Sequence, residues 1–179
     1  MIFFKSDKDT HFDLYYKIVN ISRGRDFYTK CQVPDTMDGR FEILILHLIV
    51  LIRKLKMENQ EQLSQSIVDL MFSSIDLSLR EEGVGDLSIP KKMKKVGMVF
   101  YGRSTSLEQI LETDDVTIKK NLLDDYFLRN AFSSNASNKK NADLLSRYTI
   151  AFEGLLTKVS ISEIPKLDVQ SIIQIFNTN

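Results

Sequence analysis

The chain has 179 residues, of which 43% are hydrophobic and 27% are charged. This length and composition are typical of a single soluble globular domain that buries a core of its own. The 24 basic and 24 acidic residues give a formal net charge of zero, which argues against general attraction to nucleic acid or anionic lipid and leaves only a local basic patch. The single cysteine, Cys31, excludes an internal disulfide and fits a reducing compartment.

The N-terminus and the apolar segments predict a protein that stays where it is made. In the first nine residues, acidic side chains appear too early and the apolar run is too short for a signal peptide. These residues also lack the Arg- and Ser-rich composition of a transit peptide. The longest apolar run, Ile43 to Ile52, holds about ten residues, whereas a bilayer crossing needs about 20. We interpret this run as a buried core helix.

Helical spacing dominates the first third of the chain. A first helix is predicted from Thr10 to Arg23, and Asp26 is expected to cap a short turn after it. A long second helix follows, capped by Asp35 or Thr36. Its apolar residues recur at i, i+3, i+4 and i+7: Phe41, Leu44, Ile45, Leu48, Leu51, Ile52 and Leu55. Because its other faces are apolar too, this helix is expected at the centre of the fold.

The second third predicts two helices joined by a Gly-rich loop, followed by a further helix. One helix is predicted from about residue 59 to 82, and a Gly-rich loop then leads into a second helix that ends near Leu111. Thr113 is expected to cap the next helix.

The last third contains the one low-complexity stretch. Residues 133–141 are rich in Asn, Ser and Lys, and we expect a mobile loop there. A helix from about Asn141 to Leu156 follows, and residues 162–179 predict a peripheral C-terminal helix that docks on the body or on a partner. The whole pattern predicts an all-α, compact single domain over residues 1–179, with about six to eight helices around the central apolar helix.

The Gly-rich loop and the helix after it form the most distinctive segment. Gly83 and Gly85 permit backbone angles closed to other residues, Asp86 or Ser88 can cap the helix, and Pro90 suits its first turn. Four lysines lie off the apolar stripe of this helix: Lys91, Lys92, Lys94 and Lys95. The segment therefore predicts a basic helix entrance, for which a merely solvated face is the ordinary interpretation.

The residues that commonly carry catalysis are scarce. No metal-binding spacing exists among His11, His47 and Cys31, and the chain has no nucleophile elbow, phosphate loop or dinucleotide-binding unit. His47 is expected to be a hydrogen-bonded core residue with Arg40 or Asp38 as its partner. The sequence thus predicts no enzyme, no cofactor and no metal.

Three segments, in this order and spacing, resemble one family. They are Phe27-Tyr28 followed by Val33-Pro-Asp-Thr-Met-Asp-Gly-Arg-Phe-Glu and Leu46-His-Leu; then Leu79-Arg-Glu-Glu-Gly-Val-Gly-Asp-Leu-Ser-Ile-Pro-Lys-Lys-Met-Lys-Lys; and Phe100-Tyr-Gly-Arg. The pattern is similar to the ubiquinol–cytochrome c chaperone family of alphaproteobacteria and mitochondria, which assists the assembly of respiratory complex III. The strong motifs cover roughly residues 15 to 103, and weaker similarity continues to about residue 148.

The resemblance implies a non-catalytic chaperone that binds newly made cytochrome b, with the ribosome as a further partner and the oligomeric state left open. Because no import sequence is visible, it implies a bacterial, cytoplasmic protein that acts on the cytoplasmic face of the inner membrane. The residues expected to bind the client or a partner form two constellations: Asp35, Asp38, Gly39, Arg40 and His47; and Gly83, Gly85, Asp86, Pro90, Lys91, Lys92, Lys94, Lys95, Tyr101 and Arg103.

Alternatives remain open for some of these residues. Asp38 and Arg40 are equally suited to a charged pair that fixes the start of the central helix. Tyr101 and Arg103 either pack over the loop or touch the client, since aromatic and Arg residues are favoured at interaction hot spots. The four lysines are also expected to hold the protein against an anionic membrane surface.

Two other functions fit the sequence less well. One is an RNA- or ribosome-binding helical module, which the lysine cluster favours and the zero net charge disfavours. The other is a helical enzyme without a linear motif. It requires Asp35, Asp38, Arg40, His47 and Tyr101 to converge on one deep pocket.

Overall fold

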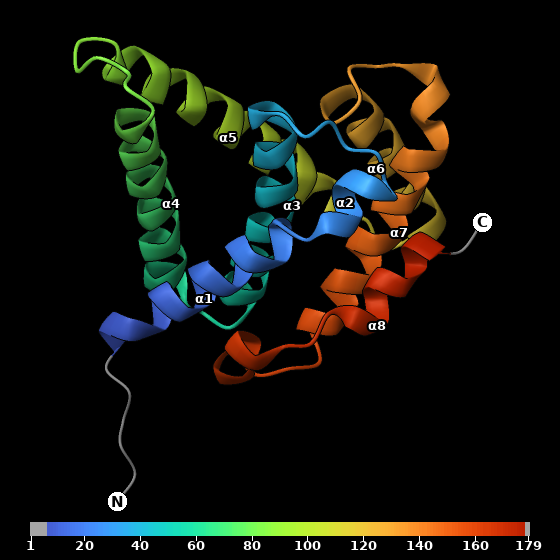
Figure 1. Ribbon diagram of the computed structural model, residues 1–179. Helices are drawn as coiled ribbons and strands as arrows, with labels where there is room; N and C mark the ends of the chain where they lie inside the picture. Colours follow the sequence, from blue (N-terminus) through green and yellow to red (C-terminus); the bar gives the residue numbers. More distant parts are fainter. Residues whose placement is uncertain (1–6, 178–179) are drawn as a thin grey trace, which may run out of the picture.

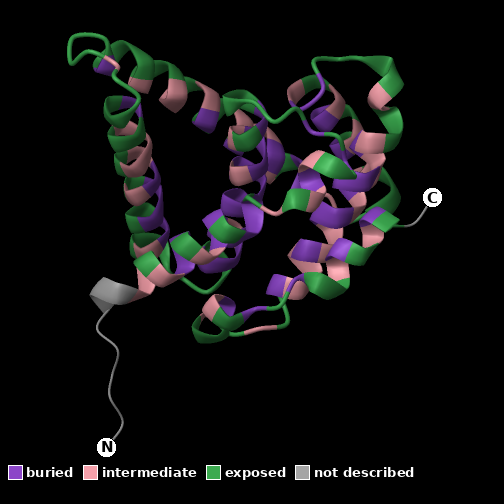
Figure 2. Cartoon of the chain, viewed as in Figure 1, coloured by how far each residue is buried: buried purple, intermediate pink, exposed green. Residues whose placement is uncertain are grey.

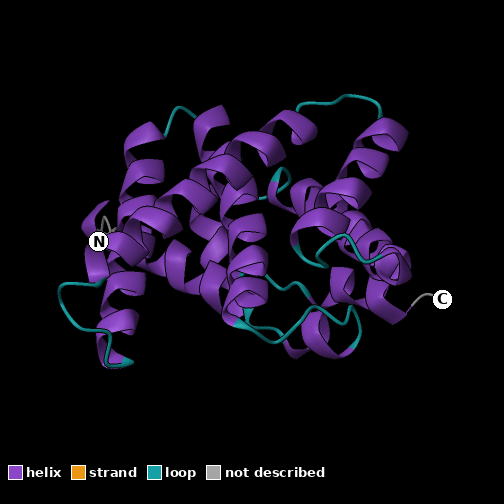
Figure 3. Cartoon of the chain, turned by 90° about the horizontal axis from the view of Figure 1, so that it is seen from above, coloured by secondary structure: helices purple, strands orange, loops and turns teal. Residues whose placement is uncertain are grey.

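The computed structural model describes residues 7–177, which are helical with short connections and contain no strand (Figure 3). The α-helices of this range are α1 (Asp7–Ser22), α2 (Arg25–Thr29), α3 (Met37–Met57), α4 (Glu61–Glu81), α5 (Ile89–Leu111), α6 (Val116–Asn130), α7 (Lys139–Leu156) and α8 (Gln170–Ile173). Three short 3₁₀ segments join them: η1 (Ala136–Asn138), η2 (Ile161–Lys166) and η3 (Gln174–Asn177). The predicted all-α fold is confirmed. The described residues do not include 1–6, on which the expected absence of a targeting signal partly rests. They also do not include 178–179, the last two residues of the expected C-terminal helix.

Helix α3 lies at the centre of the fold, as its apolar surface predicts. Every residue from Ile43 to Ile52 is buried except the half-buried Leu44. Helices α1, α4, α5 and α7 all pack against α3, so that it is covered on several sides (Figures 1 and 2). Burial of a Leu or Ile side chain contributes about 1.5–3 kcal/mol, and α3 therefore supplies a large part of the stability.

Two groups of helices flank α3. On one side α1, α4 and α5 enclose it, and on the other α6 packs along α7 (Figure 1). The C-terminal segment docks on the body of the protein: the buried ring of Phe176 lies 5.3 Å from Phe27 and 5.3 Å from Tyr148, measured between ring centroids. The first contact is edge-on and the second is tilted, and such ring contacts stabilise the protein beyond the area that they bury.

The helix starts confirm some of the expected caps and correct others. The Thr36 side chain accepts a hydrogen bond of 3.2 Å from Gly39 N and caps α3, and Pro90 lies in the first turn of α5. Of the two residues expected to cap α5, Ser88 stands at the N-cap position, although its side chain makes no capping hydrogen bond, and Asp86 binds Arg80 instead.

Other boundaries differ by a few residues. Helix α1 starts at Asp7 and ends at Ser22, and Asp26 lies inside the first turn of α2 instead of capping it. The cap of α6 is Asp115, whose side chain accepts a 2.9 Å hydrogen bond from Ile118 N, and Thr113 is not the cap. The polar stretch at 133–141 contains η1 and the start of α7 at Lys139.

Candidate functional site

Helices α4 and α5 diverge from the loop that joins them, and the start of α3 faces the space between them (Figure 1). A groove of about 300 Å³ lies there. Its wall is apolar and is built by Met37, Phe41, Ile75, Leu79, Val96 and Val99. Its rim is charged and is built by Asp38, Lys92 and Lys95. We refer to these nine residues as the lysine-rimmed groove.

A second hollow of about 240 Å³ opens on the other side of the same wall, between α1, α3 and α4. It shares Met37, Phe41, Ile75 and Leu79 with the lysine-rimmed groove, and Arg40 lines it. Met37 is 61% exposed although it is a large apolar residue. An apolar surface that continues between two hollows and is rimmed by charge is typical of a protein-binding surface.

Tyr101 lies in a third hollow of about 300 Å³, which α3, α4 and α5 line further along their lengths. Its ring lies 6.1 Å from that of Phe72 and 5.3 Å from that of Phe100, measured between centroids. Tyr101 therefore packs on the body of the protein and remains more than half exposed.

The start of α3 is held by local contacts. Arg40 Nε donates a 2.6 Å hydrogen bond to Asp35 Oδ1, and this bond lowers the pKa of the Asp35 carboxyl. The charged pair at the helix entry is thus Arg40 with Asp35 and not Arg40 with Asp38. Gly39 is buried, and a Cβ atom there would lie 2.0 Å from the carbonyl oxygen of Pro34.

His47 is fully buried, as the apolar run around it predicts, but its partners were predicted wrongly. Its Nδ1 lies 2.7 Å from the Ile43 carbonyl oxygen and its Nε2 lies 2.8 Å from the Tyr148 hydroxyl. Neither Asp38 nor Arg40 contacts it. Burial lowers the pKa of His47 to about 4, so that the ring is neutral near pH 7, with Nδ1–H donating to Ile43 and Nε2 accepting from Tyr148. In this conformation His47 is inaccessible to a partner.

Arg103 has an intramolecular partner. Its Nε donates a 3.0 Å hydrogen bond to Oε2 of Glu42, which is only 3% exposed. Burial raises the pKa of Glu42, while the Tyr126 hydroxyl and Arg103 act in the opposite direction and favour the charged form. Arg103 therefore joins α5 to α3, and sequence reasoning gave no reason to single out Glu42.

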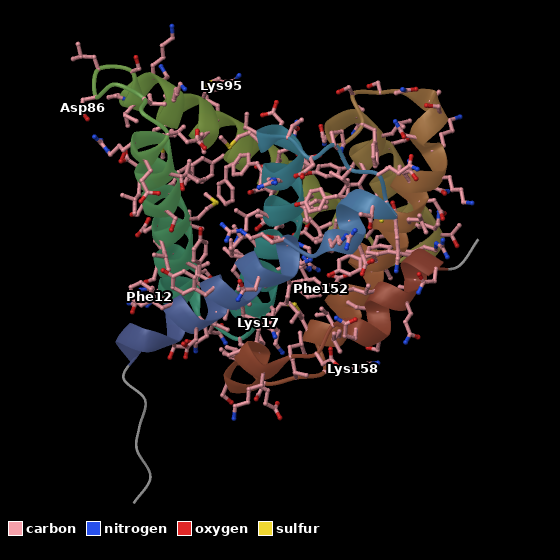
Figure 4. The ribbon with its side chains drawn as sticks, viewed as in Figure 1. Phe12, Lys17, Asp86, Lys95, Phe152 and Lys158 are labelled. Carbon is pink, nitrogen blue, oxygen red and sulfur yellow. The ribbon has the colours of Figure 1, made fainter. Side chains whose placement is uncertain are left out.

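The loop between α4 and α5 stands at one extremity of the molecule (Figure 4). Gly83 has φ +84°, a conformation that favours glycine, whereas Gly85 is not among the positive-φ residues of the described range, and the prediction for Gly85 is wrong. Arg80 binds both Asp76 and Asp86, which fixes one side of the loop. Lys91, Lys92, Lys94 and Lys95 are all exposed, as their position off the apolar stripe predicts.

The structure brings together only part of the expected site. Asp38, Lys92 and Lys95 share the lysine-rimmed groove, and Arg40 lies in the adjoining hollow. His47 is inside the core and Tyr101 lies in a different hollow, so that these residues do not converge on one deep pocket as an enzyme would require. Gly83 and Pro90 shape the loop and the helix start, and no such requirement is seen at Gly85.

Sequence reasoning missed the apolar wall of the groove. Phe41 and Val96 lie on apolar stripes that the sequence predicts to face the core, yet both are only half-buried. An apolar stripe in the sequence shows which face of a helix is apolar. It does not show how much of that face a neighbouring helix covers, because this depends on how far the two helices diverge. Met37, which precedes the stripe, gave no signal at all.

Comparison with known proteins agrees with the resemblance. A family model of the ubiquinol-cytochrome C chaperone matches residues 29–167, from the end of α2 through η2. The chain belongs to this family. The matched range includes the lysine-rimmed groove and the loop between α4 and α5.

Curated relatives and a solved structure support the same conclusion. Ubiquinol-cytochrome c reductase complex assembly factor 1 of Mus musculus is 23% identical over 75% of this chain and 45% of its own length, and that of Xenopus laevis is 21% identical over 69% and 60%. The chain thus spans about half the length of these relatives. The crystal structure of the Cbp3 homolog from Brucella abortus superposes with a TM-score of 0.75 at 32% identity, covering 89% of this chain and 86% of that one.

No membrane-crossing helix was found within residues 7–177, since none of the helices there combines the necessary length and apolar character.

Proposed function

We propose that this protein is a non-catalytic assembly chaperone that binds newly made cytochrome b and assists the assembly of the ubiquinol–cytochrome c reductase complex. The observation that carries the proposal is the family match over residues 29–167, with relatives named as assembly factors of that complex. The proposed place of action is the cytoplasmic face of the inner membrane, because the client is an integral membrane protein.

The lysine-rimmed groove is the proposed client-binding surface. Its wall offers aliphatic and aromatic side chains that adapt to an apolar segment, including the half-exposed Met37, and methionine is common at surfaces that accept varied partners. Lys92 and Lys95 on one rim and Asp38 on the other can bind charged residues that flank such a segment. The groove adjoins the hollow that contains Arg40, which gives a longer client room to continue.

The other expected residues act on this surface indirectly in the proposal. Gly39, Asp35 and Arg40 fix the start of α3, which carries Met37 and Phe41 into the wall of the groove. Arg103 fixes α5 on α3 through Glu42. Contact with the ribosome stays a prediction that rests on the exposed lysines. If these lysines bind ribosomal phosphates, ribosome binding should fall steeply as the salt concentration rises.

Deletion of the gene tests the proposal. We expect the strain to lose most of its spectroscopically detected cytochrome b and of its assembled ubiquinol–cytochrome c reductase, because an unprotected apolar client is degraded or aggregates. Other respiratory complexes, and the complemented strain, serve as controls. Normal levels of cytochrome b and of the assembled complex in the deletion strain would contradict the proposal.

A further inference from the structure

The outer surface of the α4–α5 loop and of the first half of α5 differs from the groove side of the same hairpin. Lys91, Lys94 and Met98 are spaced i, i+3 and i+7 and therefore share one face of α5. None of the three lines the lysine-rimmed groove, whereas Lys92 and Lys95 do. We call Leu87, Lys91, Lys94 and Met98 the hairpin tip.

The apolar residues of the hairpin tip are exposed to an extent that folding does not explain. Leu87 is 99% exposed and Met98 is 69% exposed. Leu87 stands in the loop between the two helices, at the extremity of the molecule that also carries Asp86 and Lys95 (Figure 4). A leucine that makes no core contact and projects from a loop adds nothing to the stability of the folded chain.

The charges at the hairpin tip are also unfavourable for the isolated protein. The first turns of α5 contain four lysines and no acid in the first turn, although the partial positive charge of a helix N-terminus disfavours cations there. None of the ion pairs within residues 7–177 involves Lys91 or Lys94.

The nearby acids offset these cations only in part. Residues 80–95 contain five cations (Arg80 and the four lysines) and three acids (Glu81, Glu82 and Asp86), which leaves an excess of two positive charges. Arg80 binds Asp86 as well as Asp76, whereas no ion pair of the described residues involves Lys91 or Lys94. The local potential is therefore positive although the net charge of the chain is zero.

From these observations we infer that the hairpin tip docks on the surface of an anionic lipid bilayer, with Leu87 and Met98 in the interfacial region and Lys91 and Lys94 at the acidic headgroups. Exposed aliphatic residues beside lysines match this partner, because the boundary between headgroups and acyl chains accepts both groups at once. The inference goes beyond the proposed client binding, since it concerns a different surface and a different partner.

The same residues fit nucleic acid less well. Single-stranded RNA is recognised by stacking on aromatic side chains and on Arg guanidinium groups. The hairpin tip contains neither: Arg80 is held by Asp76 and Asp86, and Tyr101 packs beside Phe72. Aliphatic side chains at an exposed tip add affinity for lipid and none for phosphate.

Flotation of the full chain with vesicles tests the inference. We expect the protein to float with vesicles rich in phosphatidylglycerol and not with pure phosphatidylcholine vesicles. Each lysine near an anionic surface contributes roughly fivefold to partitioning, so Lys91→Gln/Lys94→Gln should weaken it about 30-fold. Leu87→Gln should weaken it about tenfold, because the variant loses the insertion of a leucine into the interface.

A matched control removes the same charge from positions away from the hairpin tip. Lys17 and Lys158 lie far from Asp86 and Lys95 (Figure 4), and Lys17→Gln/Lys158→Gln is expected to float as the parent does. The Lys91→Gln/Lys94→Gln variant should unfold at the same temperature as the parent or slightly above it, because it removes cations from the start of a helix.

Three results would overturn the inference. The first is a parent that floats with neither kind of vesicle. The second is an equal loss of flotation in the Lys17→Gln/Lys158→Gln control. The third is binding to single-stranded RNA that depends on Lys91 and Lys94, is unaffected by Leu87→Gln and is accompanied by no vesicle binding. None of these results would bear on capture of the client, which is measured separately by co-purification and with variants of the groove wall.

Discussion

Replacing Gly39 by alanine is expected to destabilise the protein by about 3 kcal/mol, because the new Cβ atom would lie 2.0 Å from the carbonyl oxygen of Pro34. The clash is with backbone, and Val33 Cγ1 closes the same space at 3.3 Å, so the start of α3 has to move. For a chain of this size the expected fall in the thermal unfolding midpoint is about 6–12 °C. Differential scanning calorimetry measures it.

The control for this variant is Gly102→Ala in α5. A Cβ atom at Gly102 would meet nothing within 4 Å, and alanine is the better helix former, so the midpoint is expected to stay or to rise slightly. If Gly39→Ala unfolds at the same temperature as the parent, the close approach of Pro34 to α3 is not the reason for a glycine at position 39. The glycine would then have to be explained by partner binding.

Removing the Arg103 side chain is expected to lower the free energy of unfolding by about 3 kcal/mol. This value is at the low end for breaking a buried ion pair, because the guanidinium group is about one-third exposed. Arg103→Ala leaves the charge of Glu42 buried without its cationic partner, with the Tyr126 hydroxyl as the remaining group that favours the carboxylate. The double variant Glu42→Gln/Arg103→Ala no longer buries a charge and is expected to recover a large part of the loss. Chemical denaturation of the parent, both single variants and the double variant gives the coupling free energy.

The pH dependence of the Arg103→Ala variant is a second readout. Burial raises the pKa of Glu42, so that the folded state binds its proton more tightly than the unfolded state does. The cost of ionising Glu42 is therefore absent below the ordinary glutamate pKa of 4.5 and is complete above the raised pKa. The deficit of the variant should accordingly shrink as the pH falls. If the variant is as stable as the parent yet fails to capture its client, Arg103 is a contact residue and not a structural one.

The sequence predicts the helices well because the fold is built from long apolar stripes. The run from Ile43 to Ile52 defines α3 without any knowledge of its neighbours, and Thr36 and Pro90 mark helix starts through local hydrogen bonding and a fixed φ angle. Where two capping residues stand close together, as Thr113 and Asp115 do, local chemistry does not choose between them.

The functional surface is less predictable because it depends on contacts between distant parts of the chain. Glu42 and Arg103 are 61 positions apart, and His47 and Tyr148 are 101 positions apart. Residues that the resemblance implies as client contacts therefore include some with purely internal partners. The divergence of α4 from α5, which opens the lysine-rimmed groove, is likewise invisible in the spacing of apolar residues.

The division of the lysines between two surfaces is a further feature that spacing alone does not reveal. Lys92 and Lys95 line the groove, whereas Lys91, Lys94 and Met98 do not, although Lys95 is only one helical turn from Lys91. The two proposals are therefore compatible, because a client bound in the groove leaves Leu87, Lys91, Lys94 and Met98 free for the bilayer.

Capture of newly made cytochrome b by the tagged protein tests the central claim most directly. The parent is expected to co-purify with pulse-labelled cytochrome b, and Met37→Gln/Val96→Gln in the groove wall is expected to lose most of it. The matched control, Met57→Gln/Val116→Gln, changes the same residue types at exposed positions outside the groove and should capture the client as the parent does. Failure of the parent to capture cytochrome b, or equal capture by the groove variant and the control, would contradict the account.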